Sequence, residues 1–105
     1  MAASDRRSEG QFRGYLASTL ARLGQMSEAR ACLDVGEQLL LDMSDRLSYA
    51  LLMCHRAEIE TRASQPQAAK QAIESAERLA VELDAGPASE LRRRLATLQV
   101  PTPLA

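Results

Sequence analysis

Aromatic residues are nearly missing from this 105-residue chain: Trp is absent, and Phe12, Tyr15 and Tyr49 are the only aromatic side chains. Val and Ile are also scarce, which disfavours β-strands, because β-branched and aromatic residues pack best on a sheet. The apolar residues, 46% of the chain, are mostly Ala, Leu and Met, and Ala and Leu lose little rotamer freedom in a helix. The composition therefore predicts an all-α protein, and the length fits a single domain.

Cysteine and histidine are scarce too, since Cys32, Cys54 and His55 are the only such residues. A structural zinc site takes about four Cys or His ligands at short spacing, so we expect no metal, and no motif indicates a cofactor. Cys32 and Cys54 fall on apolar helical stripes and are interpreted as small buried hydrophobes. Adjacent helix residues point about 100° apart, which disfavours a catalytic Cys54–His55 pair. His55 is therefore interpreted as an ordinary surface or groove residue.

The chain also lacks an excess of either charge and any long apolar run. Its net charge is −1, which leaves no positive field to attract nucleic acid. The basic clusters at 6–7 and 92–94 are interpreted as solvated helix faces. No apolar run approaches the roughly 20 residues of a membrane span, and no signal peptide is evident. We therefore expect a cytoplasmic protein that binds neither nucleic acid nor membrane.

Enzyme motifs are missing as well. The sequence has no glycine-rich phosphate loop, GxSxG, HExxH or CxxC, the short patterns that place phosphates, nucleophiles or metals. Glu58 and Glu74 lie four residues before Arg62 and Arg78, the spacing of a solvated helical ion pair. We therefore expect a non-enzymatic protein with no catalytic residue and no small-molecule substrate.

Apolar residues do recur at helical spacing in five segments, which predicts five helices. Two helix pairs are expected at 9–43 and 44–84, followed by a shorter capping helix at about 88–99. Together these form a folded domain at 9–99, between flexible ends at 1–8 and 100–105. The stripe of the first helix is expected to face the core and consists of Phe12, Tyr15, Leu16, Thr19, Leu20 and Leu23.

Turn residues mark the expected helix ends. Gly24 follows the last periodic residue of the first helix and suits the left-handed conformation of a C-cap. Ser44 and Ser64 are interpreted as N-caps of the helices that follow them, Ser64 with Gln67 as a capping box. Gly36 lies inside the second helix, where it costs about 1 kcal/mol relative to Ala. A close helix–helix approach is expected to compensate for it.

An internal repeat relates the second helix to the fourth at an offset of 40 residues. The matched positions are Ala29 with Ala69, Leu33 with Ile73, Gly36 with Ala76 and Leu39 with Leu79. A period of this size, with one helix pair per unit, is typical of an α-solenoid.

The first unit resembles the tetratricopeptide repeat (TPR) family at its packing positions, which are Leu16-Ala17, Leu20, Gly24, Ala29, Leu33 and Gly36. The second unit keeps Ala57, Ala69, Ile73 and Ala76. It departs from the family at Arg56 and Glu60, where apolar residues are usual, and at Ser64, where the turn glycine is usual. The resemblance covers about 11–83. It implies antiparallel helix pairs stacked as a short TPR-like α-solenoid, with a groove lined by the first helix of each pair.

Three further runs, at 36–37, 52–58 and 85–91, are similar to the extreme C-terminal helical repeats of large bacterial signalling proteins. Those proteins include predicted ATPases fused to nucleotide-cyclase or Ser/Thr-kinase domains. The similarity implies that the chain belongs to a larger bacterial signalling or regulatory protein.

The TPR resemblance implies a non-catalytic protein–protein interaction module that binds a peptide or partner protein in its groove. The groove positions that it implies are Gln11, Ser18, Arg22, Cys54, Glu58 and Arg62.

Self-association is the main alternative to partner binding. Two pairs and a cap are short for a solenoid, which usually needs about three repeats. A symmetric homodimer would bury apolar residues that a small core leaves uncovered, and the residues in question are Leu40, Leu41, Met43 and Leu104. A helical bundle unrelated to solenoids fits the periodicity as well. The third alternative is an enzyme with a pocket at 54–58.

Overall fold

The computed structural model describes residues 3–87 and 89–98, and of residues 3–5 it describes the backbone alone. Within these ranges the chain is all-α, as the composition predicts, and contains no strand. The five helices are α1 (Ala3–Arg22), α2 (Met26–Asp42), α3 (Arg46–Arg62), α4 (Pro66–Glu82) and α5 (Glu90–Leu98). None of the described helices has the length and hydropathy of a membrane span.

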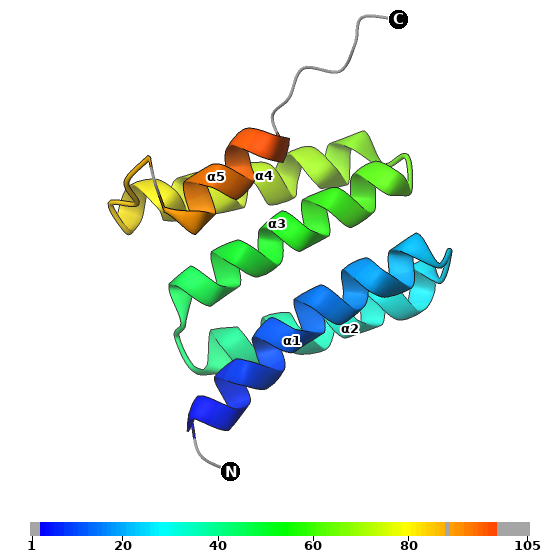
Figure 1. Ribbon diagram of the computed structural model, residues 1–105, viewed down its shortest axis with the longest axis horizontal. Helices are drawn as coiled ribbons and strands as arrows, with labels where there is room; N and C mark the ends of the chain where they lie inside the picture. The colour runs from blue at the N-terminus through cyan, green and yellow to red at the C-terminus, as the bar shows by residue number, and fades with distance from the viewer. Residues whose placement is uncertain (1–2, 88, 99–105) are drawn as a thin grey trace, which may run out of the picture.

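The helices pack as two hairpins and a single terminal helix. α1 packs along α2, and α3 packs along α4. α3 also contacts both helices of the first pair, and α5 contacts both helices of the second. Figure 1 shows α1, α3 and α5 in one layer, with α2 and α4 behind them. The single helix α5 therefore takes the place against the second pair that α3 takes against the first.

The 40-residue period extends from the sequence to the helix ends. α2 and α4 begin at residues 26 and 66 and end at residues 42 and 82, and α1 and α3 end at residues 22 and 62. The two pairs therefore match residue for residue, although α1 begins at Ala3, within the segment 1–8 that we expected to be flexible.

Each of the first four helices ends in the same turn. A residue with positive φ recurs every 20 positions, at Gly24, Ser44, Ser64 and Asp84. The amide after each one donates back to a carbonyl five residues earlier, as in Gln25 N to Leu20 O at 2.9 Å. This is the Schellman motif, which satisfies carbonyls that the helix end would leave free.

These turns confirm Gly24 as a C-cap residue and correct two other predictions. Ser44 and Ser64 are not N-caps, because each belongs to the turn that closes the preceding helix. Asp45 caps α3 instead, with its carboxylate accepting from the Ser48 amide at 3.1 Å. Gln65 is the N-cap of α4 and forms no side-chain cap bond, so the expected capping box is not present.

Replacing either serine with glycine should stabilise the protein. The left-handed conformation costs an L-residue about 1–2 kcal/mol, partly offset by the greater unfolded-state entropy of glycine. We expect Ser44→Gly and Ser64→Gly each to raise the free energy of unfolding by about 0.5–1 kcal/mol in urea denaturation. Gly24→Ser is the matched control and should lower it by a similar amount. An equal loss of stability in all three variants would contradict this reading of the turns.

The orientation of α1 differs from the prediction. Most of its expected core stripe faces outward, since Phe12 is 60% exposed and Leu23 67% exposed, whereas Leu20 is partly buried and packs against the core. The buried face of α1 is made of small residues instead, and these are Gly10, Gly14, Ala17, Ser18 and Ala21. Such residues let helix backbones approach closely, so α2 and α3 pack against the small face and leave the large apolar residues outside.

Gly36 confirms the close approach expected at that position. A Cβ there would lie 3.1 Å from Arg13 Cβ and 3.2 Å from the carbonyl oxygen of Gly10. Gly10 lies against Leu40, and a Cβ added to Gly10 would lie 2.7 Å from Leu40 Cγ. Glycines on both helices therefore bring the backbones of α1 and α2 together.

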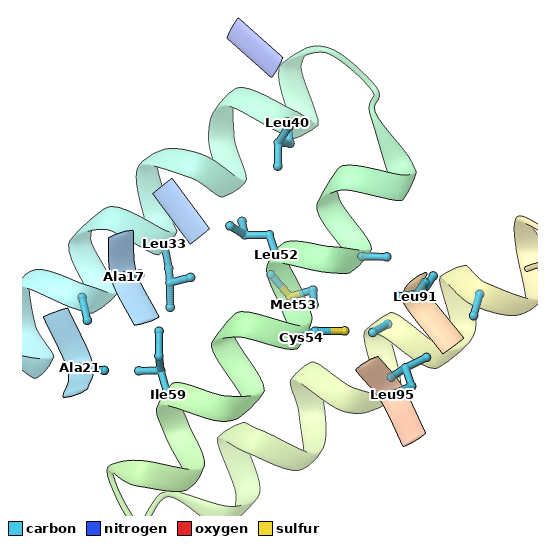
Figure 2. Packing of buried hydrophobic residues seen from close by; sticks show 14 residues of the cluster. Ala17, Ala21, Leu33, Leu40, Leu52, Met53, Cys54, Ile59, Leu91 and Leu95 are labelled. Carbon is cyan, nitrogen blue, oxygen red and sulfur yellow. The ribbon is translucent and has the colours of Figure 1, made fainter. Parts of the chain in front are cut away.

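Leucine and isoleucine fill the space that the small residues leave. Figure 2 shows this core, in which Leu33, Leu40, Leu52, Ile59 and Leu91 are the largest fully buried side chains. The core covers Leu40 completely, contrary to expectation, whereas Leu41 is 51% exposed and Met43 is half-buried. Leu104 lies outside the described residues. Cys54 is buried, as predicted, and Cys32 is half-buried.

Polar contacts join the two pairs where the second unit departs from the TPR pattern. Arg30 of α2 donates to both carboxylate oxygens of Glu60, at 3.1 and 2.6 Å. Arg56 pairs with Asp34 at 2.8 Å and with Glu37 at 3.5 Å. Arg56 and Glu60 therefore face α2, so ion pairs replace apolar packing at these two positions.

Candidate functional site

The layer formed by α1, α3 and α5 has a surface with two small cavities over α3. The first, of about 110 Å³, lies between α1, α3 and α5 and is lined by Gln11, Tyr15, Ser48, Leu51, Leu52, His55 and Glu90. The second, also of about 110 Å³, lies between α3 and α5 and is lined by Cys54, Glu58, Arg94, Thr97 and Leu98. We call the surface that holds both cavities the α3 groove.

A polar bridge crosses the α3 groove from α5 to α1. The Arg94 guanidinium donates to the Tyr15 hydroxyl at 3.1 Å and lies 5.5 Å from the centre of its ring. Arg94 is also paired with Glu90 at 3.3 Å. Tyr15 is 53% exposed, and such exposed contacts contribute roughly 1 kcal/mol or less. The bridge joins two residues that lie 79 positions apart in the sequence. It is weak enough for a bound partner to displace.

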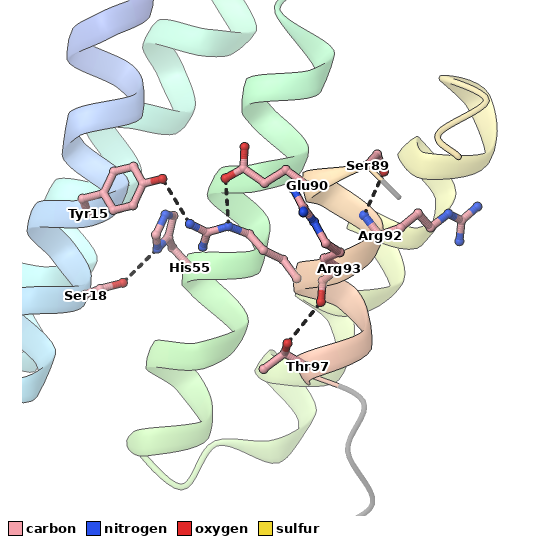
Figure 3. Close-up of polar contacts among 9 residues, drawn as sticks. Tyr15, Ser18, His55, Ser89, Glu90, Arg92, Arg93 and Thr97 are labelled. Atoms are coloured by element: carbon pink, nitrogen blue, oxygen red, sulfur yellow. Dashed lines mark hydrogen bonds and ion pairs between the residues drawn. The ribbon is translucent and has the colours of Figure 1, made fainter. Parts of the chain in front are cut away.

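His55 lies at the floor of the first cavity, beneath Tyr15. Figure 3 shows its ring between α3 and α1, with Nδ1 joined to Ser18 Oγ by a hydrogen bond of 2.9 Å. The Tyr15 and His55 rings pack edge to face, with their centres 4.8 Å apart. His55 is 5% exposed, so it is not a surface residue, although it lines the α3 groove. Burial, with Arg94 and Arg22 nearby, lowers its pKa to about 4, so the ring is neutral at pH 7.

Cys54 is directed away from this ring. Its side chain lies between α3 and α5 and is 2% exposed. Burial raises the pKa of the thiol to about 11. Cys54 is therefore a neutral thiol at pH 7, with little of the thiolate that makes a cysteine nucleophilic.

The predicted groove residues divide into an exposed and a buried set. Gln11 is exposed and donates to Ser48 Oγ at 2.8 Å. Arg22 of α1 pairs with Glu58 of α3 at 3.6 Å, and both are accessible to solvent. Arg62 is exposed at the end of α3. Gln11 and Glu58 line the two cavities of the α3 groove, and Arg22 reaches the groove through its pair with Glu58.

The other two, Ser18 and Cys54, are buried and offer a partner almost no surface. Ser18 belongs to the small face of α1. Cys54 follows Gly14 of that face by one 40-residue period and faces α5 instead of solvent.

Neither of the two expected ion pairs within a helix forms among the described residues. Among the described residues, Glu58 pairs with Arg22 and not with Arg62, and Glu74 forms no ion pair with Arg78. Pairing between helices thus replaces the i, i+4 pairing that the sequence indicates for Glu58.

Sequence analysis missed the contribution of α5. Glu90, Arg94 and Thr97 line the α3 groove, although we expected this helix only to cap the stack. Ser48 was missed as well, and it binds both Gln11 and the Asp45 carboxylate. No local pattern indicates that Arg94 reaches Tyr15, because the contact depends on how α5 crosses α3.

No three His, Cys, Asp or Glu side chains within residues 3–87 and 89–98 gather closely enough to hold a metal ion. The chain matches no protein-family model, no curated protein and no solved structure.

Proposed function

We propose that the chain is a non-catalytic interaction module that binds a peptide or partner protein in the α3 groove. The Arg94–Tyr15 bridge is the observation that carries this proposal. It spans two cavities lined by both apolar and polar side chains, and it consists of two accessible side chains that a ligand can replace. A surface of this kind suits an extended or helical peptide that supplies its own acceptor to Arg94.

The packing order supports a TPR-like geometry. α3 lies against both helices of the first pair, and α5 lies against both helices of the second. This arrangement places the first helix of each unit on one side, as a TPR-like groove requires. We further propose that the module works in the cytoplasm and forms part of a larger bacterial signalling or regulatory protein. The proposal of a larger protein rests on the sequence similarity alone.

Charge reversal at the groove should weaken partner capture from the native host. We expect Arg22→Glu and Arg62→Glu each to reduce capture at least tenfold, because Arg22 pairs with Glu58 in the groove and Arg62 is exposed one helical turn beyond Glu58 on α3. Arg78→Glu on α4 is the matched control, since it is exposed on the other layer. A photo-crosslinker at Gln11 should attach to the captured protein, whereas one at Gln71 should not. Unchanged capture in all three charge variants would remove the groove from consideration.

A further inference from the structure

Three apolar residues, Phe12, Leu16 and Leu23, lie in a stripe on the outside of α1 and the residue after its end, with Thr19 between Leu16 and Leu23. Phe12, Leu16, Thr19 and Leu23 follow one another at spacings of four, three and four residues. Phe12, Thr19 and Leu23 are exposed, and Leu16 is partly exposed. They extend along about 16 Å of the helix, at 1.5 Å per residue. We call this stripe the outer face of α1; it lies opposite the buried small residues Gly10, Gly14 and Ala17.

The equivalent face of α3 is an interface within the chain. By the 40-residue period, Phe12 and Thr19 correspond to Leu52 and Ile59, which are 2% and 0% exposed. Leu52 lies against Gly14 and Gly36 of the first pair. Helix pairs of this repeat therefore bury this face against another helix, and no described helix covers it on α1.

The charges on α1 leave its outer face free to meet an identical face. Its described arginines are all in ion pairs: Arg6 with Asp42, Arg7 with Asp45, Arg13 with Glu9, and Arg22 with Glu58. Like charges that meet across an interface between identical chains usually oppose association. Here each positive charge is already balanced inside its own chain.

We propose that the outer face of α1 binds the same face of a second copy of this chain, in a two-fold symmetric dimer with antiparallel α1 helices. A symmetric interface needs a self-complementary patch. Spacings of four, three and four residues meet that need, because they are the seam spacing of two packed helices. In an antiparallel pairing, Phe12 lies near Leu23 of the partner subunit, and the centre of the stripe lies on the two-fold axis.

This dimer leaves the α3 groove open. The groove residues Gln11 and Arg22 lie about a quarter turn from the stripe on α1, at 100° per residue. Each copy in the dimer can therefore bind a partner, and a bivalent partner would be held more tightly through the increased effective concentration. The dimer does not depend on the proposed groove function.

Analytical ultracentrifugation of the whole chain, from low micromolar to millimolar concentration, tests the proposal. We expect a monomer–dimer equilibrium whose midpoint falls within this concentration range, because an interface of one helix per chain lies at the small end of stable complexes. Phe12→Lys and Leu23→Lys should each weaken the dimer at least tenfold. Val81→Lys is the matched control, since Val81 is 70% exposed on α4 and should have no effect.

The exposure of Phe12 and Leu23 means that neither substitution removes a core contact, and thermal unfolding of each variant verifies this. A chain that stays monomeric over the whole range overturns the proposal, even if its outer face captures some other helical protein. A dimer that all three lysine variants weaken equally, or that Phe12→Lys and Leu23→Lys leave intact, overturns it as well.

Discussion

Acidification from pH 7 to about pH 4.5 is expected to destabilise the fold by about 2.5 kcal/mol through His55 alone. The pKa of this residue falls from 6.5 to about 4 on folding, because burial disfavours the charged ring. The unfolded chain therefore binds a proton between these two values that the folded chain does not bind. Stability is full above about pH 6.5 and decreases as the pH falls toward 4. Urea denaturation at several pH values measures this slope.

Carboxylates act in a lower pH window, so the two effects can be separated. Hydrogen bonds and the charge of Arg30 lower the pKa of Glu60 below 4.5. Burial raises the pKa of Asp45, but hydrogen bonds from Ser48 and Arg7 outweigh it and bring that pKa below 3.8. Each contributes stability that is present above its unfolded pKa and is lost as the pH falls through its folded value. The slope between pH 6.5 and 4.5 therefore reports His55.

His55→Asn is the matched control for this titration. Asparagine places a polar atom near the position of Nδ1, so it can keep the hydrogen bond to Ser18. It does not titrate, and so the variant should be less stable at pH 7 but lose the slope between pH 6.5 and 4.5. A slope of the same size in the variant would mean that His55 is not the group responsible.

A valine at Gly14 is expected to lower the free energy of unfolding by about 3 kcal/mol, the upper part of the usual range for overpacking a core. An added Cβ would lie 2.7 Å from His55 Cδ2 and 3.1 Å from Leu52 Cδ1. Both neighbours are buried and cannot move away without disturbing the contact between α1 and α3. The helix propensity of valine exceeds that of glycine, so propensity alone predicts a small gain. Thermal and urea unfolding of the Gly14→Val variant decide between the loss expected from overpacking and the gain expected from helix propensity.

Two further variants identify the cause of the Gly14→Val effect. Ser8→Val makes a comparable change on the exposed side of the same helix and should alter stability by less than about 0.5 kcal/mol. Combining Gly14→Val with His55→Ala makes room for the new side chain, so the double variant should be more stable than the sum of the single effects implies. Strict additivity would show that the collision with His55 is not the cause.

Several features of this protein could be predicted from local sequence patterns. The abundance of Ala and Leu, the apolar periodicity and the turn residues indicate five helices, and the 40-residue period appears again in their bounds. Gly24 and Gly36 were predicted correctly, because a positive φ and a close helix contact both favour glycine. These properties depend on residues near in sequence, or on the absence of a side chain.

The candidate site could be predicted only in part. Gln11, Arg22 and Glu58 lie at or beside the α3 groove, at positions that were expected from the resemblance to TPR repeats. The burial of His55 and the reach of Arg94 to Tyr15 depend on how three helices cross. No pattern within one helix contains that information.

The sequence by itself determined the five helices, most of their ends and their pairing, since these follow from propensity, periodicity and short turns. Only the tertiary structure decided which face of α1 is buried. Its large and small residues recur with the same helical period on opposite sides, so the hydrophobic pattern favours the side with Phe12 and Leu16. Packing favours the other side, because Gly10, Gly14 and Ala17 let α2 and α3 approach closely enough for Leu40 and Leu52 to fill the space between them.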